Sequence, residues 1–118
     1  MQLLIDHITR YTYSAPAAGI VQVLKLTPSD TDSQQVVNWR VDVDVDGRMM
    51  PATDAFGNVC HMFYAERPVE VLTLHVTGTV ITTDTAGVVG GATEPLPPIL
   101  FRRSTPLTEV TSAIEMLA

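Results

Sequence analysis

The sequence lacks several features that would place it in particular protein classes. It has one cysteine, Cys60, so no disulfide can form within the chain and nothing indicates an oxidising compartment. The 13 acidic residues outnumber the 7 Lys and Arg, for a net charge of -6. A nucleic-acid binder needs a basic surface, and this chain has none. No apolar run approaches the roughly 18 residues that span a bilayer.

The first residues also do not have the pattern of a signal peptide. The opening residues, Met1–Tyr11, contain an acid at Asp6 and no basic segment followed by an apolar run, so they are typical of a first strand rather than a signal peptide. Together these absences predict a cytoplasmic protein without nucleic-acid or membrane partners.

What the chain does have is enough apolar material for a core. Hydrophobic residues make up 46% of its 118 residues and charged residues 17%, which is typical of a globular chain. A domain of this length buries roughly two-thirds of the surface of its unfolded chain. The sequence therefore predicts one domain that folds without disulfides or metals.

Alternation of apolar and polar residues dominates the first 82 positions. Because successive side chains of a strand point to opposite faces, this alternation predicts strands. The predicted strands are 1–13, 20–27, 37–45, 59–65 and 71–82, and Met49 to Ala55 has no clear pattern. Val37 is expected on the apolar face of its strand, and Leu4 and Ile8 are expected to be partly covered. The spacing of the breaks favours an all-β fold, an immunoglobulin-like antiparallel β-sandwich of about 6–8 strands.

The last third of the chain has a different composition. Residues 82–93 are rich in Thr and Gly and are expected to form a mobile loop, followed by an extended Pro95–Pro98 segment. A helix is expected to begin at Ser104, with a capping hydroxyl and a proline in its first turn. It carries an apolar stripe and ends with the chain, which indicates a truncated helix. The predicted boundary separates residues 1–103 from residues 104–118.

Three alternating aspartates raise the question of a metal site. Asp42, Asp44, Asp46 and Gly47 match the first half of an EF-hand calcium loop, but position twelve of that loop would be Thr53 instead of the required glutamate. On a strand the three carboxylates would lie about 7 Å apart on one face. The sequence therefore predicts a solvated acidic face and no metal.

Cysteine and histidine occur side by side at Cys60 and His61. A nucleophile and its base must share a hydrogen bond, whereas neighbours on a strand point to opposite faces. His7 and His61 lie on apolar faces and are expected to be core histidines. A structural zinc site needs about four ligands, and three histidines with one cysteine on another face do not complete one. We expect no catalytic residue and no cofactor in this chain.

Four stretches together resemble the N-terminal region of bacterial transglutaminase-like proteins, which are described as cysteine proteases. The similarity covers roughly residues 1 to 110, and Asp54-x-x-Gly57-Asn58-x-x-His61 is its sharpest element. The stretches are His7–Tyr13, Leu24–Pro28, Asp54–Asn58 with His61 and Phe63, and Leu100–Phe101 leading to Ser104–Thr108.

The resemblance implies a β-sandwich that precedes a papain-like catalytic domain, whose Cys, His and Asp perform acyl transfer or amide hydrolysis. None of those triad residues can be assigned here, and Cys60 stands where the family usually has an aliphatic residue. It also implies that residues 104–118 begin a helix leading to the catalytic domain. Asp54, Gly57, Asn58 and His61 are then a turn with a structural or interdomain role, Gly57 supplying a positive φ.

Three functions are compatible with these observations. The first is a non-catalytic accessory domain that positions the downstream catalytic domain, or shapes access to it, in the same polypeptide. The second is a free-standing β-sandwich that binds a protein or peptide through a sheet face or the Pro95–Pro98 segment. The third is a small enzyme, for which no residue constellation is found. Exposed strand edges and the apolar helix also predict some self-association.

Overall fold

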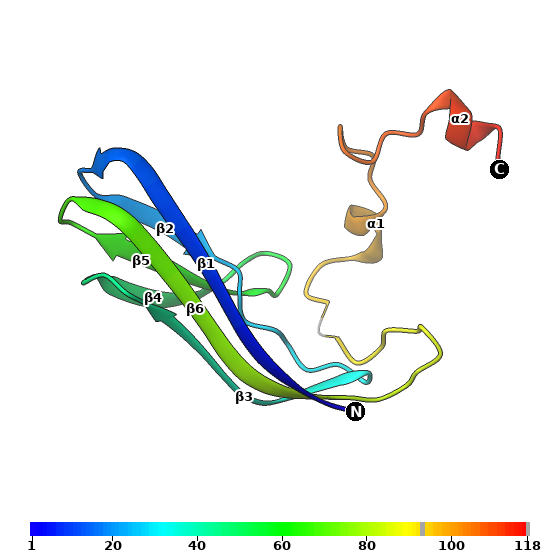
Figure 1. The fold of residues 1–118 in the computed structure, drawn as a ribbon. Coiled ribbons are helices and arrows are strands. Elements are labelled where there is room, and N and C mark those ends of the chain that lie inside the picture. Colours follow the sequence, from blue (N-terminus) through cyan, green and yellow to red (C-terminus); the bar gives the residue numbers. More distant parts are fainter. Residues whose placement is uncertain (93, 118) are drawn as a thin grey trace.

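The computed structural model describes residues 1–92 and 94–117 and is built mainly from strands (Figure 1). The six strands are β1 (Gln2–Ala17), β2 (Ile20–Leu24), β3 (Gln34–Val43), β4 (Arg48–Thr53), β5 (Val59–Ala65) and β6 (Val69–Thr82). Two four-residue helices follow, α1 (Pro98–Phe101) and α2 (Ser112–Glu115). The all-β prediction is confirmed, and the number of strands lies within the predicted range.

The strands form two antiparallel three-stranded sheets. The first sheet has the order β1-β6-β3 and the second the order β2-β5-β4. The order β2-β5-β4 is that of strands B, E and D in an immunoglobulin domain, and the β3–β6 pair matches strands C and F. The first strand differs, because β1 pairs with β6 instead of with β2. Strands consecutive in sequence therefore mostly alternate between the sheets, and among the described strands only β4 and β5 are joined as a hairpin.

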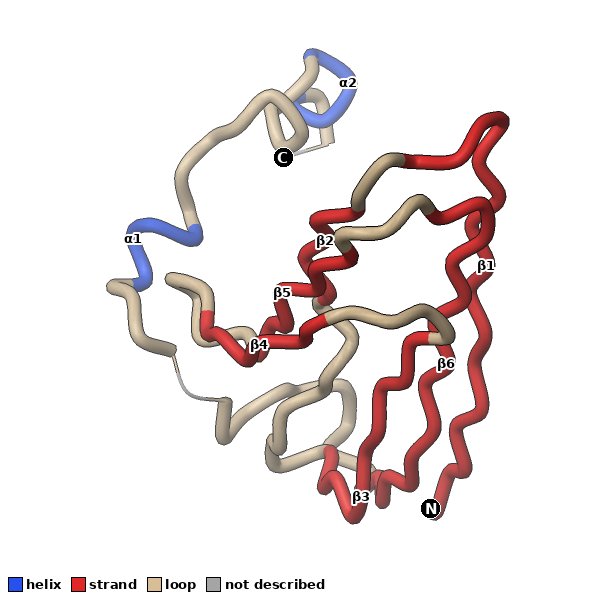
Figure 2. Tube along the Cα trace, turned by 90° about the vertical axis from the view of Figure 1, so that its left-hand side faces the viewer, coloured by secondary structure: helices blue, strands red, loops and turns tan. Residues whose placement is uncertain are grey.

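One apolar core joins the two sheets at one end of the long strands. Its buried residues come from the second sheet and from the first half of β6: Ile20, Leu24, Phe63, Ala65, Val69, Leu72 and Leu74. Tyr13 and Ala17 of β1 and Val41 and Val43 of β3 pack against this cluster. The second sheet thus covers only one half of the first sheet, and the other half of β1, β6 and β3 extends beyond it (Figure 2).

Trp39 anchors the extended half of the first sheet. It lies opposite Gly78 in the β3–β6 register, and a Cβ atom on Gly78 would come within 2.2 Å of the indole ring. The indole Nε1–H donates to the carbonyl of Leu26 at 2.8 Å. The ring therefore covers the glycine of the neighbouring strand and holds the β2–β3 connection against the sheet.

Several strand boundaries differ from those predicted. β1 continues through Pro16 to Ala17, because its register with β6 is interrupted between Thr12 and Ala17, where a proline removes no ladder hydrogen bond. Arg48–Thr53 is a strand although its sequence pattern is poor, since it pairs as an edge strand along β5.

Some side chains also lie on other faces than expected. The β3 register shifts between Val36 and Asn38, so Val37 occupies a bulge and is 54% exposed instead of facing the core. Leu4 and Ile8 are 79% and 61% exposed, and His7 is exposed and is not a core histidine. Leu4 and Ile8 lie opposite Thr79 and His75, on the face of β1 turned away from the core, so the prediction that they are partly covered was wrong. His7 is on the core-side face, opposite Val76, but outside the part of β1 that packs against the core cluster.

The helix expected from Ser104 begins at Ser112 instead. Residues 102–111 form turns and bends, and the four-residue α1 precedes them. Leu107, the first residue of the predicted apolar stripe, is 97% exposed. An isolated short helix is unstable in water without a surface on which to bury its apolar face, which accounts for the difference. The division of the chain at residue 103 stays a prediction.

Candidate interdomain junction

The β4–β5 hairpin turn contains the sharpest motif of the sequence. The Asp54 and Asn58 backbones close it: the Asp54 N–H donates to the Asn58 carbonyl and the Gly57 N–H to the Asp54 carbonyl, each at 3.0 Å. Gly57 has a φ of 83°, a region that side chains with a Cβ atom avoid. The predicted positive φ at Gly57 is therefore present.

The Asp54 carboxylate organises this turn. Its Oδ1 accepts the backbone N–H groups of Phe56 and Asn58 at 2.9 Å each, and its Oδ2 accepts the Asn58 side-chain amide at 2.9 Å. This is the Asx-type bonding expected of the motif. Asp54 and Asn58 thus brace the turn through three hydrogen bonds, in addition to the backbone bonds that close it.

Lys25 ties the turn to the end of β2. Its ammonium donates to Oδ2 of Asp54 at 2.6 Å. This hydrogen bond, followed by that from Asn58, holds the pKa of Asp54 well below its usual range, and the same bond raises the pKa of Lys25. The two motif stretches Leu24–Pro28 and Asp54–Asn58, distant in sequence, therefore meet at one charged contact.

The C-terminal segment contacts the same turn. The rings of Phe56 and Phe101 meet edge to face, with centroids 5.8 Å apart and planes inclined at 60°. An open groove of about 480 Å³ runs beside them, lined by Ser29, Asp30, Phe56, Gly57, Asn58, Gly91, Ala92, Glu94 and Phe101. The C-terminal segment therefore touches the turn through Phe101, a contact that the sequence motif did not reveal.

His61, the fourth predicted motif residue, is not part of this turn. It lies in β5 opposite Leu24 of β2 and Pro51 of β4, and it is half-buried. Its Nδ1 atom is buried without a hydrogen-bond partner among the described residues, as is Oε1 of Gln22. The structure thus brings Asp54, Gly57 and Asn58 together and places His61 on the core side of the sheet.

Cys60 faces away from His61. The alternation of β5 turns His61 and the core residue Phe63 to one side and Cys60 to the other. Cys60 is 4% exposed, and its thiol donates to the carbonyl of Asn58 at 3.4 Å. The two neighbours therefore cannot share the hydrogen bond that a thiolate–imidazole pair requires.

The three aspartates of the calcium-like sequence point to different partners. Asp42 pairs with Arg40 at 2.6 Å, and the Asp44 carboxylate accepts the backbone N–H of Thr73 at 2.7 Å. Asp46 follows the end of β3 and lines a surface depression. Within residues 1–92 and 94–117, no group of three or more His, Cys, Asp or Glu side chains could hold a metal ion.

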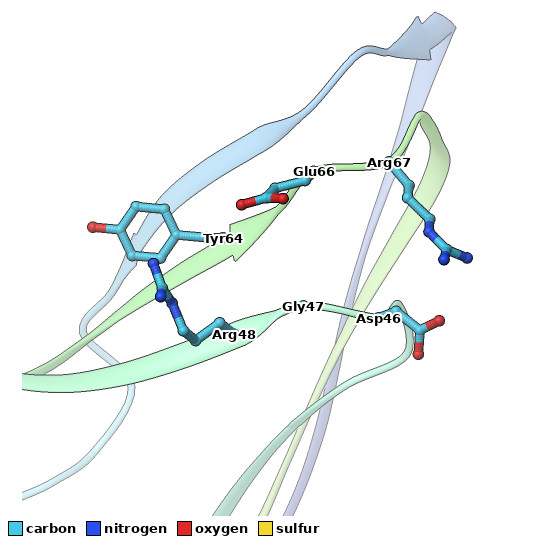
Figure 3. Close-up of a pocket in the computed structure, with 6 residues that line it drawn as sticks. All are labelled: Asp46, Gly47, Arg48, Tyr64, Glu66 and Arg67. Atoms are coloured by element: carbon cyan, nitrogen blue, oxygen red, sulfur yellow. The ribbon is translucent and has the colours of Figure 1, made fainter.

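That depression, of about 320 Å³, is a second candidate site (Figure 3). The Arg48 guanidinium lies 5.5 Å from the centre of the Tyr64 ring, in cation–π contact. Asp46, Glu66 and Arg67 complete a rim of mixed charge, and all of these charged side chains are exposed. Exposed charges without a buried functional group hold a ligand weakly, so the β4–β5 turn is the stronger candidate.

Fold and site together define an all-β domain whose braced hairpin turn contacts the chain leaving the sheets. Comparison with family models gives its family: residues 3–81 match the bacterial transglutaminase-like N-terminal region, and the chain belongs to this family. The match is shorter than the predicted 1–110, and the fourth stretch, residues 100–108, lies outside it. No curated protein and no solved structure showed a significant match. Among the described residues, no helix is long and apolar enough to cross a membrane.

Proposed function

We propose that this chain is a non-catalytic accessory domain of a transglutaminase-like cysteine hydrolase or acyltransferase, and that it positions the downstream catalytic domain or shapes access to it. The contact between Phe56 in the motif turn and Phe101 in the C-terminal segment carries this proposal. It ties the direction in which the chain leaves the domain to a turn that is itself fixed by Asp54.

The construction of the turn suits such a role. A linker that leaves a domain freely sets no orientation, whereas a linker held by an aromatic pair against a braced hairpin does. Asp54 braces the hairpin through hydrogen bonds to Asn58, Phe56 and Lys25. The buried Cys60, turned away from His61, supports placing the catalytic nucleophile outside this chain.

The test uses the complete gene product and a pair of variants at this contact. Phe56→Ala and Phe101→Ala should each lower kcat/KM on an amide substrate severalfold, because the aromatic pair contributes about 0.5–1.5 kcal/mol. Leu107→Ala is the matched control, since this apolar side chain of the same segment is 97% exposed. Unchanged kcat/KM in both phenylalanine variants would rule out orientation through this contact.

A free-standing binding domain is the alternative, and one observation favours it. The face of the second sheet turned away from the core exposes Val21, Val23 and Met50 at 71%, 52% and 46%. Such a face could hold a peptide or protein. Reading the gene beyond codon 118 separates the two: downstream Cys, His and Asp codons favour the accessory domain, and an immediate stop codon favours the binding domain. The cytoplasmic location stays a prediction from the sequence.

A further inference from the structure

The free edge of β1 differs from the other three strand edges of the molecule. β1 is the outer strand of the first sheet, and no described segment lies beside it on the side away from β6 (Figure 2). Proteins protect exposed edges with short strands, prolines, bulges or lysines. β2 has five residues, β4 has six and contains Pro51, and β3 has the bulge at Val37. From Gln2 to Thr12, β1 pairs with β6 without a bulge and contains neither proline nor lysine.

The pairing of Met1 shows which residues of β1 direct their backbone N–H and C=O groups away from β6. Met1 and Thr82 exchange both backbone hydrogen bonds, so they are a hydrogen-bonded pair of the β1–β6 ladder. The register is unbroken up to Thr12, so the odd-numbered residues of β1 bond to β6. The even-numbered residues therefore direct their N–H and C=O groups away from the sheet, where they are available to another strand. These are Gln2, Leu4, Asp6, Ile8, Arg10 and Thr12.

The side chains of the same even-numbered residues form an exposed face with an internal charge pattern. Leu4 and Ile8 are 79% and 61% exposed. Asp6 and Arg10 are the two charged residues of the strand, and they flank Ile8 at equal distance in sequence. His75 of β6 occupies only Oδ1 of Asp6, at 2.8 Å, so Oδ2 of this 76% exposed carboxylate can take a second partner.

We propose that two copies of this chain pair antiparallel through β1, about a two-fold axis that passes beside Ile8. In this register Ile8 lies opposite Ile8 of the partner copy, and Asp6 lies opposite Arg10 of the partner copy on both sides of the axis. Opposite charges on directly paired positions stabilise a sheet, and like charges destabilise it. The interface is self-complementary, as a two-fold dimer requires.

The charges also exclude the neighbouring registers. An axis at Asp6 would place two carboxylates opposite each other, and an axis at Arg10 would place two guanidinium groups opposite each other. Axes at His7 and Thr9 leave each charge opposite an uncharged side chain. The axis at Ile8 is therefore the one that pairs both charges, and it joins the two first sheets into one six-stranded sheet. This dimer does not depend on the proposed accessory role.

Charge reversal tests both the edge and the register. Arg10→Asp and Asp6→Arg each place two pairs of like charges across the axis. The dimer of either variant alone should therefore have a Kd about tenfold or more above that of the wild-type dimer. Mixing the two variants restores Asp–Arg pairs at both positions, so the mixture should form a heterodimer about as strong as the wild-type dimer. Sedimentation velocity over the micromolar range measures all four samples.

Arg40→Asp is the matched control, because it makes the same change of charge on the same face of the sheet, level with Asp6, but on the opposite edge strand. It should dimerise like the wild type. Circular dichroism and thermal unfolding establish that each variant is folded. A wild-type chain that stays monomeric, an Arg10→Asp variant that dissociates no more than Arg40→Asp, or a mixture that stays monomeric would each overturn the proposal.

Discussion

At the scale of single residues, Asp54 contributes most visibly to the turn. Its carboxylate accepts four hydrogen bonds, from Lys25, Phe56 and both nitrogens of Asn58. Since Lys25 and Asn58 favour the charged form, the pKa of Asp54 is lowered in the folded state. A lowered carboxyl pKa stabilises the fold above the ordinary value of 3.8, and this contribution is lost as the pH falls through and below that value.

Asp54→Asn should therefore lower Tm most at neutral pH, and the difference from the wild type should narrow as the pH falls below about 4. Thermal unfolding followed by circular dichroism at several pH values measures this. Asp46→Asn is the control, because it makes the same change at an exposed aspartate beyond the end of β3. A Tm difference for Asp54→Asn that is the same at every pH would contradict the account.

Gly57 supplies the conformation that the Asp54 network requires. With φ at 83°, any Cβ atom strains the turn, so Gly57→Ala should lower the free energy of unfolding by about 1–2 kcal/mol. Gly57→Asn should cost less, because asparagine tolerates this region of backbone space better than alanine does. Urea unfolding measures both variants, and equal losses would show that the positive φ is not the cause.

At the scale of elements, β3 and β6 of the first sheet fit together where the indole ring of Trp39 covers Gly78. Gly78→Ala would place a methyl group into the indole ring, so it should lower the free energy of unfolding by about 1–3 kcal/mol. Urea unfolding followed by the fluorescence of Trp39, the single tryptophan, measures this. Thr77→Ala, on the opposite face of β6, should change stability far less.

Sequence patterns predicted the elements whose two faces differ in polarity. β5 matches its predicted bounds, and β6 begins two residues earlier than predicted. β4 was not predicted, since an edge strand with a proline carries little alternation and is defined by its pairing with β5. The bulge at Val37 was not predicted either, because an extra residue in a strand leaves the local sequence pattern intact and appears only in the register.

At the scale of the whole molecule, the motif located the turn but not its surroundings. Asp54, Gly57 and Asn58 could be predicted as a group because their roles are local to one hairpin. The contacts of this hairpin with Lys25 and Phe101 depend on how distant segments meet, which no local pattern records. Leu4 and Ile8 are exposed because they lie on the outer face of the first sheet, and His7 is exposed because the core lies at the other end of β1; both facts likewise become visible only in the assembled fold.

We propose that this domain contributes to catalysis without carrying the catalytic residues. The most direct test compares kcat/KM on an amide substrate for the complete gene product, for the same product without residues 1–103, and for residues 1–118 alone. Residues 1–118 should show no activity, with or without Cys60→Ala, and removal of residues 1–103 should lower kcat/KM. Activity of residues 1–118 that is lost in Cys60→Ala, or an unchanged kcat/KM without residues 1–103, would contradict this proposal.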